Sequence, residues 1–399
     1  MRSHVAFLNL PAHGHVRPTL PLVSELVARG HRVTYAVGEE YAEVVAGAGA
    51  EPVPYRSPLA GRPTPTEMTP DVIAEVPLTY LRENIAAMEV CPAVLERDRP
   101  DLVLYDTTMF AAGRILSRSL GVPAIRTFPT FAQHERFSVD QLAGPRYGVD
   151  PRHPKFTEFF LRLVQLLADH GMAGADVGAF LGEVEPRNLV FLPRRAQLAE
   201  ETFDDRFEFV GPCLDPEAER GGFEAPPGDG PLVLISLGSA FNDRPDFFRD
   251  CAAAFAGQPE RVLLALGKSG VAASLGPLPP NVVAHPWLPL HAVLKQTSVC
   301  VTHGGFGTSL MALHHRTPLL CVPQHVENDF VAERLGELGV AHALKPADVT
   351  PESLRTAIRR VLADDSQRER VARFSDEMAT GGGVARAADV VEESLRAQG

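Results

Sequence analysis

The chain has 399 residues and a formal net charge of −12, with 45% hydrophobic and 22% charged residues. This length allows two domains with full cores, and the composition is that of an ordinary soluble protein. The acidic balance, without a basic run, argues against a nucleic-acid partner. No apolar run reaches the roughly 18 residues that a membrane-spanning helix needs.

The five cysteines include no Cys-x-x-Cys pair. Cys300 and Cys321 lie in apolar strand patterns, so we expect small core residues rather than disulfides or a structural zinc site. No signal peptide precedes the first expected strand. These features predict a cytoplasmic protein without a metal site.

The first half of the chain alternates short apolar runs, typical of buried parallel strands, with helical patterns. Strands are expected at 4–10, 31–37, 101–106, 122–128, 188–193 and 207–210, with helices over about 20–30 and 111–120. Two long segments, 51–95 and 130–187, interrupt this alternation. Aromatic residues in such segments are more often core than ligand pocket, but their clustering in an insertion suggests a hydrophobic binding cleft.

The second half of the chain repeats the pattern. Prolines, glycines and charges at 211–230 predict a linker. Strands are then expected at 232–236, 261–266, 282–284, 298–302, 318–322 and 341–344, and helices at 308–314, 351–363, 366–378 and 384–397. The predicted fold is therefore α/β, with domains at 1–210 and 231–380, a linker at 211–230 and a last helix within 381–399.

Polar side chains follow two strands of the first predicted sheet. His13 and His15 come after the first strand, and Asp106 ends another. Ligands of open α/β folds bind at the carboxyl edge of the sheet, where a histidine oriented by a carboxylate can act as a general base. The alternative is that His15 packs the turn and Asp106 caps the next helix.

Two glycine-containing turns favour a phosphate ligand. His303, Gly304, Gly305 and Gly307 lie between a predicted strand and helix, where backbone N–H groups and the helix dipole attract anions. The expected ligand is a diphosphate, with His303 as a donor, although a plain strand-to-helix turn has the same pattern. Gly238 and Ser239 form the second turn. Trp287, the single tryptophan, stands between prolines and can offer a flat face to a nucleobase.

In this order and spacing the motifs resemble those of the nucleotide-sugar-dependent glycosyltransferases with two facing Rossmann-like domains, the GT-B architecture. The resemblance is greatest to the bacterial macrolide glycosyltransferases and covers nearly the whole chain. It rests on Pro-Ala-His-Gly-His-Val-Arg-Pro at 11–18, Asp-Leu-Val-Leu-Tyr-Asp at 101–106, Ser-Leu-Gly-Ser-Ala-Phe at 236–241, His-Gly-Gly-Phe-Gly-Thr-Ser at 303–309, Trp287, and Pro323-Gln324.

The resemblance implies that His15 is the catalytic base and Asp106 its partner. It implies a nucleotide-diphosphate-sugar site at Ser239, Trp287, Leu288, His303, Gly305, Gly307, Thr308, Met311, Glu327 and Asn328. It also implies a hydrophobic acceptor cleft, to which we assign Phe110, Phe131 and Phe137. The implied reaction is direct displacement with inversion, without cofactor or metal. The last helix would return to the N-terminal domain, and a homodimer is one allowed assembly.

Two positions depart from the family pattern. Met311 stands where many relatives have a glutamate that grips the ribose hydroxyls, and Glu327-Asn328 where many have Asp-Gln. Both changes argue against a simple UDP-glucose donor, and Met311 favours a dTDP-deoxysugar over a UDP-hexose. The alternatives are a UDP-hexose-dependent macrolide-type glycosyltransferase, a catalytically silent binding or activator protein on the same scaffold, and a sugar-nucleotide epimerase.

Overall fold

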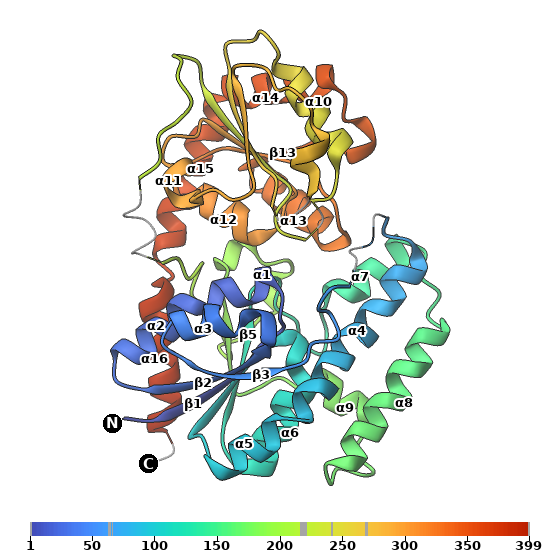
Figure 1. Ribbon diagram of the computed structural model, residues 1–399. Helices are drawn as coiled ribbons and strands as arrows, with labels where there is room; N and C mark the ends of the chain where they lie inside the picture. Colours follow the sequence, from blue (N-terminus) through green and yellow to red (C-terminus); the bar gives the residue numbers. More distant parts are fainter. Residues whose placement is uncertain are drawn as a thin grey trace. The chain divides into compact units, whose positions relative to one another are not determined.

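The computed structural model describes residues 2–62, 65, 67–215, 222–240, 242–267 and 270–397. Their contacts divide the chain into two compact units. The first unit comprises Met1–Pro63, Glu67–Cys213 and Gly381–Gly399, and the second consists mainly of Leu214–Thr380. Each unit is an α/β sandwich around its own sheet (Figure 1). The prediction of two α/β domains, with the last helix belonging to the N-terminal one, is confirmed.

The first unit contains a parallel sheet in the strand order β3-β2-β1-β4-β5-β6-β7. The order reverses between β1 and β4, and in such sheets ligands bind beyond the carboxyl ends of the strands at this point. The strands are β1 (His4–Leu8), β2 (Arg32–Gly38), β3 (Glu51–Tyr55), β4 (Leu102–Asp106), β5 (Ala124–Phe128), β6 (Arg187–Val190) and β7 (Phe207–Phe209).

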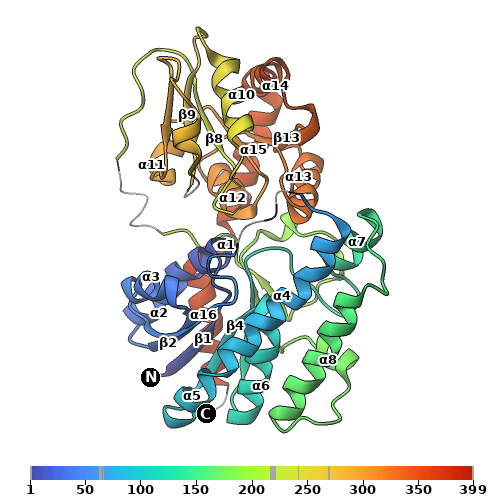
Figure 2. The same ribbon diagram turned by 45° about the vertical axis from the view of Figure 1, so that its right-hand side comes forward.

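Side chains of the central strands alternate between the two faces of this sheet. Val5 and Phe7 of β1 belong to the core under α2, α3 and α16, whereas Ala6 and Leu8 belong to the core under α4, α5, α6, α8 and α9. The two groups of helices can be followed in Figures 1 and 2. The helices are α1 (His13–Val16), α2 (Leu20–Ala28), α3 (Ala42–Gly47), α4 (Pro70–Met88), α5 (Cys91–Arg97), α6 (Phe110–Leu120), α7 (Val139–Arg146), α8 (Pro154–Asp169), α9 (Val177–Gly182) and α16 (Gly383–Arg396).

The second unit contains a parallel sheet in the order β10-β9-β8-β11-β12-β13, with α10 and α14 packed on one face. The strands are β8 (Leu232–Ser236), β9 (Arg261–Ala265), β10 (Val282–His285), β11 (Val299–Thr302), β12 (Leu319–Cys321) and β13 (Ala341–Ala343). The helices are α10 (Pro245–Phe255), α11 (Leu290–Leu294), α12 (Phe306–His314), α13 (Val326–Glu337), α14 (Pro351–Ala363) and α15 (Asp365–Ala379).

The structure corrects some local predictions. The segment 51–95 begins with the edge strand β3, whose prolines Pro52 and Pro54 obscured the strand pattern but are tolerated at an edge. Helix α12 begins at Phe306, two residues before the predicted start. Residues 216–221 of the predicted linker lie outside the described residues.

All five cysteines are buried, so the prediction that Cys300 and Cys321 are core residues is confirmed. Their burial raises the pKa of each thiol, which keeps them protonated and unreactive. In the described residues, no helix is long and apolar enough to cross a membrane.

Candidate active site

His15 and Asp106 meet at the carboxyl edge of the first unit's sheet. His15 lies in α1, which follows β1, and Asp106 is the last residue of the neighbouring strand β4. Nδ1 of His15 lies 2.9 Å from Oδ2 of Asp106. The Asp106 side chain is fully buried, whereas 18% of the His15 side chain is exposed. The structure therefore brings together the two residues that the sequence placed at one edge.

The second oxygen of Asp106 caps the turn that follows β4. Oδ1 accepts hydrogen bonds from the Thr108 N–H at 2.8 Å and from its hydroxyl at 2.6 Å. Both sequence interpretations of Asp106, as cap and as partner of His15, therefore apply to one carboxylate. Because an ionised carboxylate accepts hydrogen bonds, Nδ1 of His15 carries the proton and Nε2 is the basic nitrogen of the neutral ring. A ring held in this tautomer is suited to accept a proton at Nε2.

A buried polar cluster fixes the backbone that carries His15. The Asn9 amide donates to the His15 carbonyl oxygen at 3.0 Å and lies 2.6 Å from the Tyr35 hydroxyl. The Thr19 hydroxyl donates to the carbonyl oxygen of Val16 at 2.7 Å. Burial raises the pKa of Tyr35, so its hydroxyl stays protonated. These neutral groups hold α1 in place without adding charge beside the imidazole.

In the second unit, the turn between β11 and α12 has the form of an anion site. Gly304 has φ = +86°, and a Cβ atom there would lie 3.1 Å from the Asn328 carbonyl oxygen. Gly305 is the N-cap residue of α12 and, as a glycine, supplies no side-chain cap. The first turn of α12 therefore presents backbone N–H groups and the positive end of the helix dipole to a ligand.

The His303 ring lies between two glycine backbones. A Cβ atom at Gly238, where φ is +76°, would lie 2.5 Å from Cε1 of His303. A Cβ atom at Gly305 would lie 2.4 Å from Nε2 of the same ring. These approaches explain why glycine stands on both sides of the imidazole. These contacts also bring the turn after β8 and the turn after β11 together at one imidazole, although the sequence presents them as two separate turns.

His303 and His325 are uncharged near neutral pH in the unliganded protein. Burial, with a smaller contribution from His325, lowers the pKa of His303 to about 4. Burial also lowers the pKa of His325 to about 4. A nearby anion would raise the pKa of both rings, because opposite charges stabilise the protonated form. The site can therefore gain positive charge when a diphosphate binds.

The expected sugar-contacting residues lie at the start of α13, beside the glycine-rich turn. His325 is the N-cap residue, and its Nδ1 accepts a hydrogen bond from the Glu327 N–H at 3.3 Å. Asn328 is buried, and its Oδ1 has no hydrogen-bond partner among the described residues. Arg244 donates to Oε1 of Gln324 at 2.7 Å and thus holds the loop before α13. The sequence reasoning missed Arg244 and His325.

The remaining expected donor residues all lie in the second unit. Trp287 is 48% exposed just after β10, and Leu288 is half-buried. Ser239 and Gly307 are exposed, whereas Thr308 and Met311 are half-buried on α12. Thr308 and Met311 are three residues apart and therefore lie on the same helical face. All six of these residues are at least partly exposed, as contact with a ligand requires.

The three phenylalanines expected in the acceptor cleft differ in burial. Phe131 and Phe137 are 5% and 9% exposed. Phe137 packs against His134 and Phe203, with ring centroids 6.3 and 5.9 Å away. Phe110 is half-buried and lies 6.3 Å from Phe180. Phe110 thus has more surface to offer a ligand than Phe131 or Phe137, and the acceptor role of all three stays a prediction.

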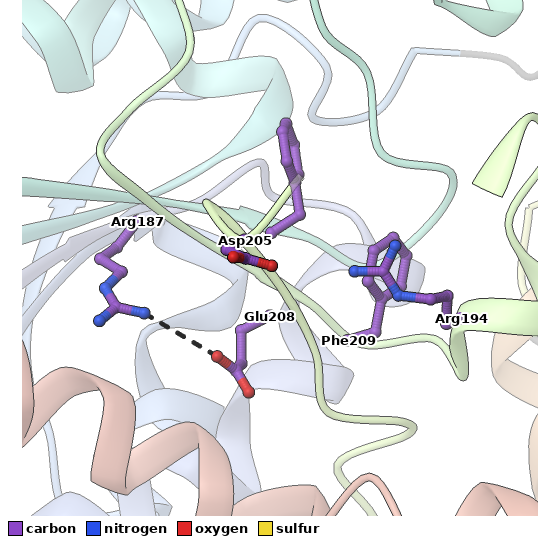
Figure 3. A pocket seen from close by; sticks show the side chains of 6 residues that line it. Arg187, Arg194, Asp205, Glu208 and Phe209 are labelled. Atoms are coloured by element: carbon purple, nitrogen blue, oxygen red, sulfur yellow. Dashed lines mark ion pairs between the residues drawn. The ribbon is translucent and has the colours of Figure 1, made fainter. Parts of the chain in front are cut away.

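A pocket of about 390 Å³ lies beside β6 and β7, and none of the residues that line it is an expected site residue (Figure 3). Arg187 and Glu208 form an ion pair of 4.0 Å in it, and the Arg194 guanidinium lies 4.4 Å from the centre of the Phe209 ring. Asp205 adds a second carboxylate. This charged lining does not match the hydrophobic cleft that the sequence predicts.

Several known proteins with similar sequences or structures are named as glycosyltransferases. The family model of the erythromycin biosynthesis protein CIII-like C-terminal domain matches residues 259–393. Demethyllactenocin mycarosyltransferase from Streptomyces fradiae is 38% identical, over 98% of this chain and 87% of its own. Oleandomycin glycosyltransferase from Streptomyces antibioticus is 37% identical, over 99% and 92%. The crystal structure of the calicheamicin glycosyltransferase CalG4 has 42% identity and a TM-score of 0.88, covering 99% and 98%.

Two parallel-sheet α/β units, one with a histidine–carboxylate pair and the other with a glycine-rich anion turn, define a glycosyltransferase of the GT-B fold. Identity of this extent over nearly the whole length goes beyond a shared fold. The chain belongs to the bacterial macrolide-type family of natural-product glycosyltransferases.

Proposed function

We propose that this glycosyltransferase moves a deoxysugar from a dTDP donor to a hydroxyl group of a hydrophobic natural product, such as a polyketide, with inversion at the anomeric carbon. The observation that carries the proposal is the 2.9 Å contact between His15 and Asp106, which provides an oriented base. The acceptor class follows relatives whose names refer to demethyllactenocin and oleandomycin. A homodimer and a cytoplasmic location stay predictions from the sequence.

In the proposed step, Nε2 of His15 takes the proton of the acceptor hydroxyl while that oxygen attacks the anomeric carbon. The bond from this carbon to the diphosphate oxygen breaks, and its electron pair leaves with the diphosphate. Attack from the side opposite the leaving group inverts the anomeric centre. Asp106 stabilises the imidazolium that forms, since its Oδ2 lies against Nδ1.

The leaving diphosphate is the proposed ligand of the turn between β11 and α12. His303 and the N–H groups at the start of α12 would stabilise the charge that develops on the leaving oxygen. We infer that these groups suffice without a metal ion or cofactor. The uncapped N-terminus of a nine-residue helix and the glycine-flanked imidazole support this assignment.

The donor preference rests on Met311. The ribose of UDP presents two neighbouring hydroxyls, which a carboxylate can accept together, whereas the deoxyribose of dTDP lacks the 2′-hydroxyl. A carboxylate facing dTDP would lose one partner and still be desolvated. A methionine packs against the carbon edge instead and accepts hydrogen bonds only weakly. The change therefore disfavours UDP by roughly 1 kcal/mol, the net value of one hydrogen bond.

Glu327 is the residue we assign to selection of the sugar. It lies in the first turn of α13 and is partly exposed. Its carboxylate can accept hydrogen bonds from sugar hydroxyls or pair with the ammonium of an amino-deoxysugar. Both roles would make the ranking of donors depend on its charge.

The decisive experiment compares His15→Ala with His303→Ala. We expect His15→Ala to lower turnover by about a hundredfold or more, as for a lost general base, with unchanged calorimetric affinity for dTDP. His303→Ala should weaken dTDP binding even without acceptor. Turnover of His15→Ala equal to that of the wild type at saturating substrate would remove His15 from the mechanism.

The substrates can be found with a panel of dTDP- and UDP-sugars and polyketide-like acceptors, read by mass spectrometry. The anomeric configuration of the product, determined by NMR, tests inversion, and turnover in EDTA tests metal independence. A folded protein that binds dTDP but neither transfers nor hydrolyses any donor would instead support the silent binding protein.

A further inference from the structure

Arg126 is a buried cation beside the His15–Asp106 pair. It lies on β5, directly opposite Tyr105 of β4, and is 3% exposed. Its Nη2 donates to the hydroxyl of Thr107 at 2.8 Å and to the Thr107 carbonyl oxygen at 3.3 Å. Thr107 is the residue directly after Asp106. The guanidinium therefore holds the turn through which the Asp106 carboxylate is positioned.

Among the described residues, no ion pair accounts for the charge of Arg126. Within the described parts of the chain no carboxylate contacts its guanidinium, and its Nε has no hydrogen-bond partner. Its ring contact is with Phe128, whose centre lies 4.8 Å from the guanidinium carbon. A buried cation without a contacting anion is unusual, because desolvation penalises an unpaired charge. The compensating charge must act over a longer distance.

Asp106 is the carboxylate left to compensate Arg126. The other buried acid nearby, Glu185, already has a partner, because Arg114 donates to it at 3.2 Å and the Tyr105 hydroxyl donates to it as well. Asp106 has neutral partners, namely His15 and Thr108. The buried carboxylates of Glu185 and Asp106 thus balance the buried guanidiniums of Arg114 and Arg126. Glu185 and Arg114 are in contact, whereas Asp106 and Arg126 interact through space.

The electrostatics of Arg126 agree with this pairing. Burial is the largest effect and lowers the pKa of Arg126 to about 10, while Tyr105, Asp106 and Glu185 act in the opposite direction and Arg114 adds to the lowering. The guanidinium therefore remains charged at neutral pH. Asp106 also acts on Tyr35, which borders the pair on the β2 side. Among the described residues, the ionisable groups near the pair include Tyr35 on β2, Tyr105 on β4, Arg114 on α6, Arg126 on β5 and Glu185, and His13 lies on the same helix as His15.

We propose that Arg126 is a positioning residue of the His15–Asp106 pair: it fixes the turn after Asp106 and supplies the positive charge that balances the buried carboxylate. The same charge opposes formation of the His15 imidazolium, so it keeps the base unprotonated near neutral pH. The catalytic consequence rests on the proposed function. The charge coupling does not, and it can be measured without substrate.

The charge is tested with Arg126→Met, which keeps the apolar stem, and Arg126→Lys, which keeps the cation. Removing the cation makes the first proton easier to bind, whichever member of the pair takes it. In Arg126→Met, the acid limb of the kcat/KM–pH profile should therefore move up by at least about 0.5 pH unit. In Arg126→Lys it should stay within about 0.2 unit of the wild type. The proposal would be overturned if the acid limbs of the wild type and Arg126→Met coincided. It would also be overturned if Arg126→Met and Arg126→Lys shifted the acid limb by the same amount.

The hydrogen bond is tested separately with Thr107→Val, which removes the hydroxyl acceptor and keeps the charge. We expect turnover to fall about fivefold, in the range of one lost hydrogen bond, without a shift of the acid limb or of dTDP affinity. If Arg126→Met does not fold, Arg126→Lys and Thr107→Val decide the question. Wild-type turnover in both would refute a positioning role.

An NMR titration of the His15 ring, assigned with His15→Gln, separates this inference from the proposed function. If the wild type transfers no sugar but Arg126→Met shifts the His15 titration upward, the proposed function fails and the charge coupling stands. If the wild type is an active transferase and the titrations of wild type, Met and Lys variants coincide, the coupling fails and the function stands.

Discussion

His303 and His325 make the second unit sensitive to acid. The pKa of each falls from an ordinary 6.5 to about 4 because of burial. Between these two pH values the unfolded chain binds protons that the folded chain does not, so the free energy of unfolding decreases as the pH falls. The loss is complete below pH 4, and each histidine contributes at most about 3 kcal/mol to it.

We therefore expect the urea midpoint of the second unit to fall between pH 7 and pH 5, and to fall less in His325→Asn. Trp287, the single tryptophan, lies in the second unit, so its fluorescence follows that unit. His314→Asn, at the end of α12, is the matched control and should keep the wild-type slope. A midpoint independent of pH in the wild type would contradict the burial of these two rings.

The residues that carry chemistry could be found from the sequence where they stand in a local pattern. His15 follows β1, and Asp106 ends β4, the strand beside β1 in the sheet; parallel strands bring their carboxyl ends to one edge. Arg126, Arg244 and His325 could not be found in this way. Arg126 lies within an apolar strand run, and its role depends on a contact with Thr107, 19 residues away in sequence.

At the scale of elements, buried strands were predicted best. Strand β8 was predicted at its observed bounds, and the strands around it within one or two residues, because continuous apolar runs are typical of parallel strands covered on both faces. Strand β3 was missed because only Val53 and Tyr55 are buried in it. Helix α13 was missed because its buried face includes the polar Asn328.

Helix α12 carries the prediction about the nucleotide. We expect the wild type to bind dTDP more tightly than UDP, and Met311→Glu to shift the preference towards UDP by up to about tenfold, the equivalent of one hydrogen bond. Competition calorimetry with the two diphosphates measures the shift. Thr308→Ser, one turn earlier on the same helix, is a control that should leave the ratio unchanged. A wild-type preference for UDP would contradict the proposed donor.

For the whole molecule, the two domains were predicted from the alternation of strands and helices and from the linker at 211–230, and the return of the last helix from the family resemblance. The side chains of α16 show why this helix belongs to the first unit. Val390 and Val391 are fully buried in its core, and Arg29 of α2 contacts Asp389 at 2.6 Å. His31 lies 3.1 Å from Glu392. None of these contacts has a local signal in the sequence.

Removal of residues 381–399 should destabilise the first unit by about 5 kcal/mol, because burial of two valines contributes roughly 1.5–3 kcal/mol each and the alanines add to it. Hydrogen exchange followed by mass spectrometry should show faster exchange in β1 and β2. Trp287 fluorescence should show an unchanged urea midpoint for the second unit. An equal loss of stability in both units would contradict the assignment of α16 to the first unit alone.

The return of α16 also sets an order of events during translation. The first unit is encoded in separate stretches, whereas nearly all of the second is one continuous stretch, Leu214–Thr380. The apolar face beneath α16 therefore stays uncovered in the nascent chain until residues 383–396 have left the ribosome. The unit that is translated second can complete its core first. The first unit, which carries His15, can complete its core only after the second unit has been translated.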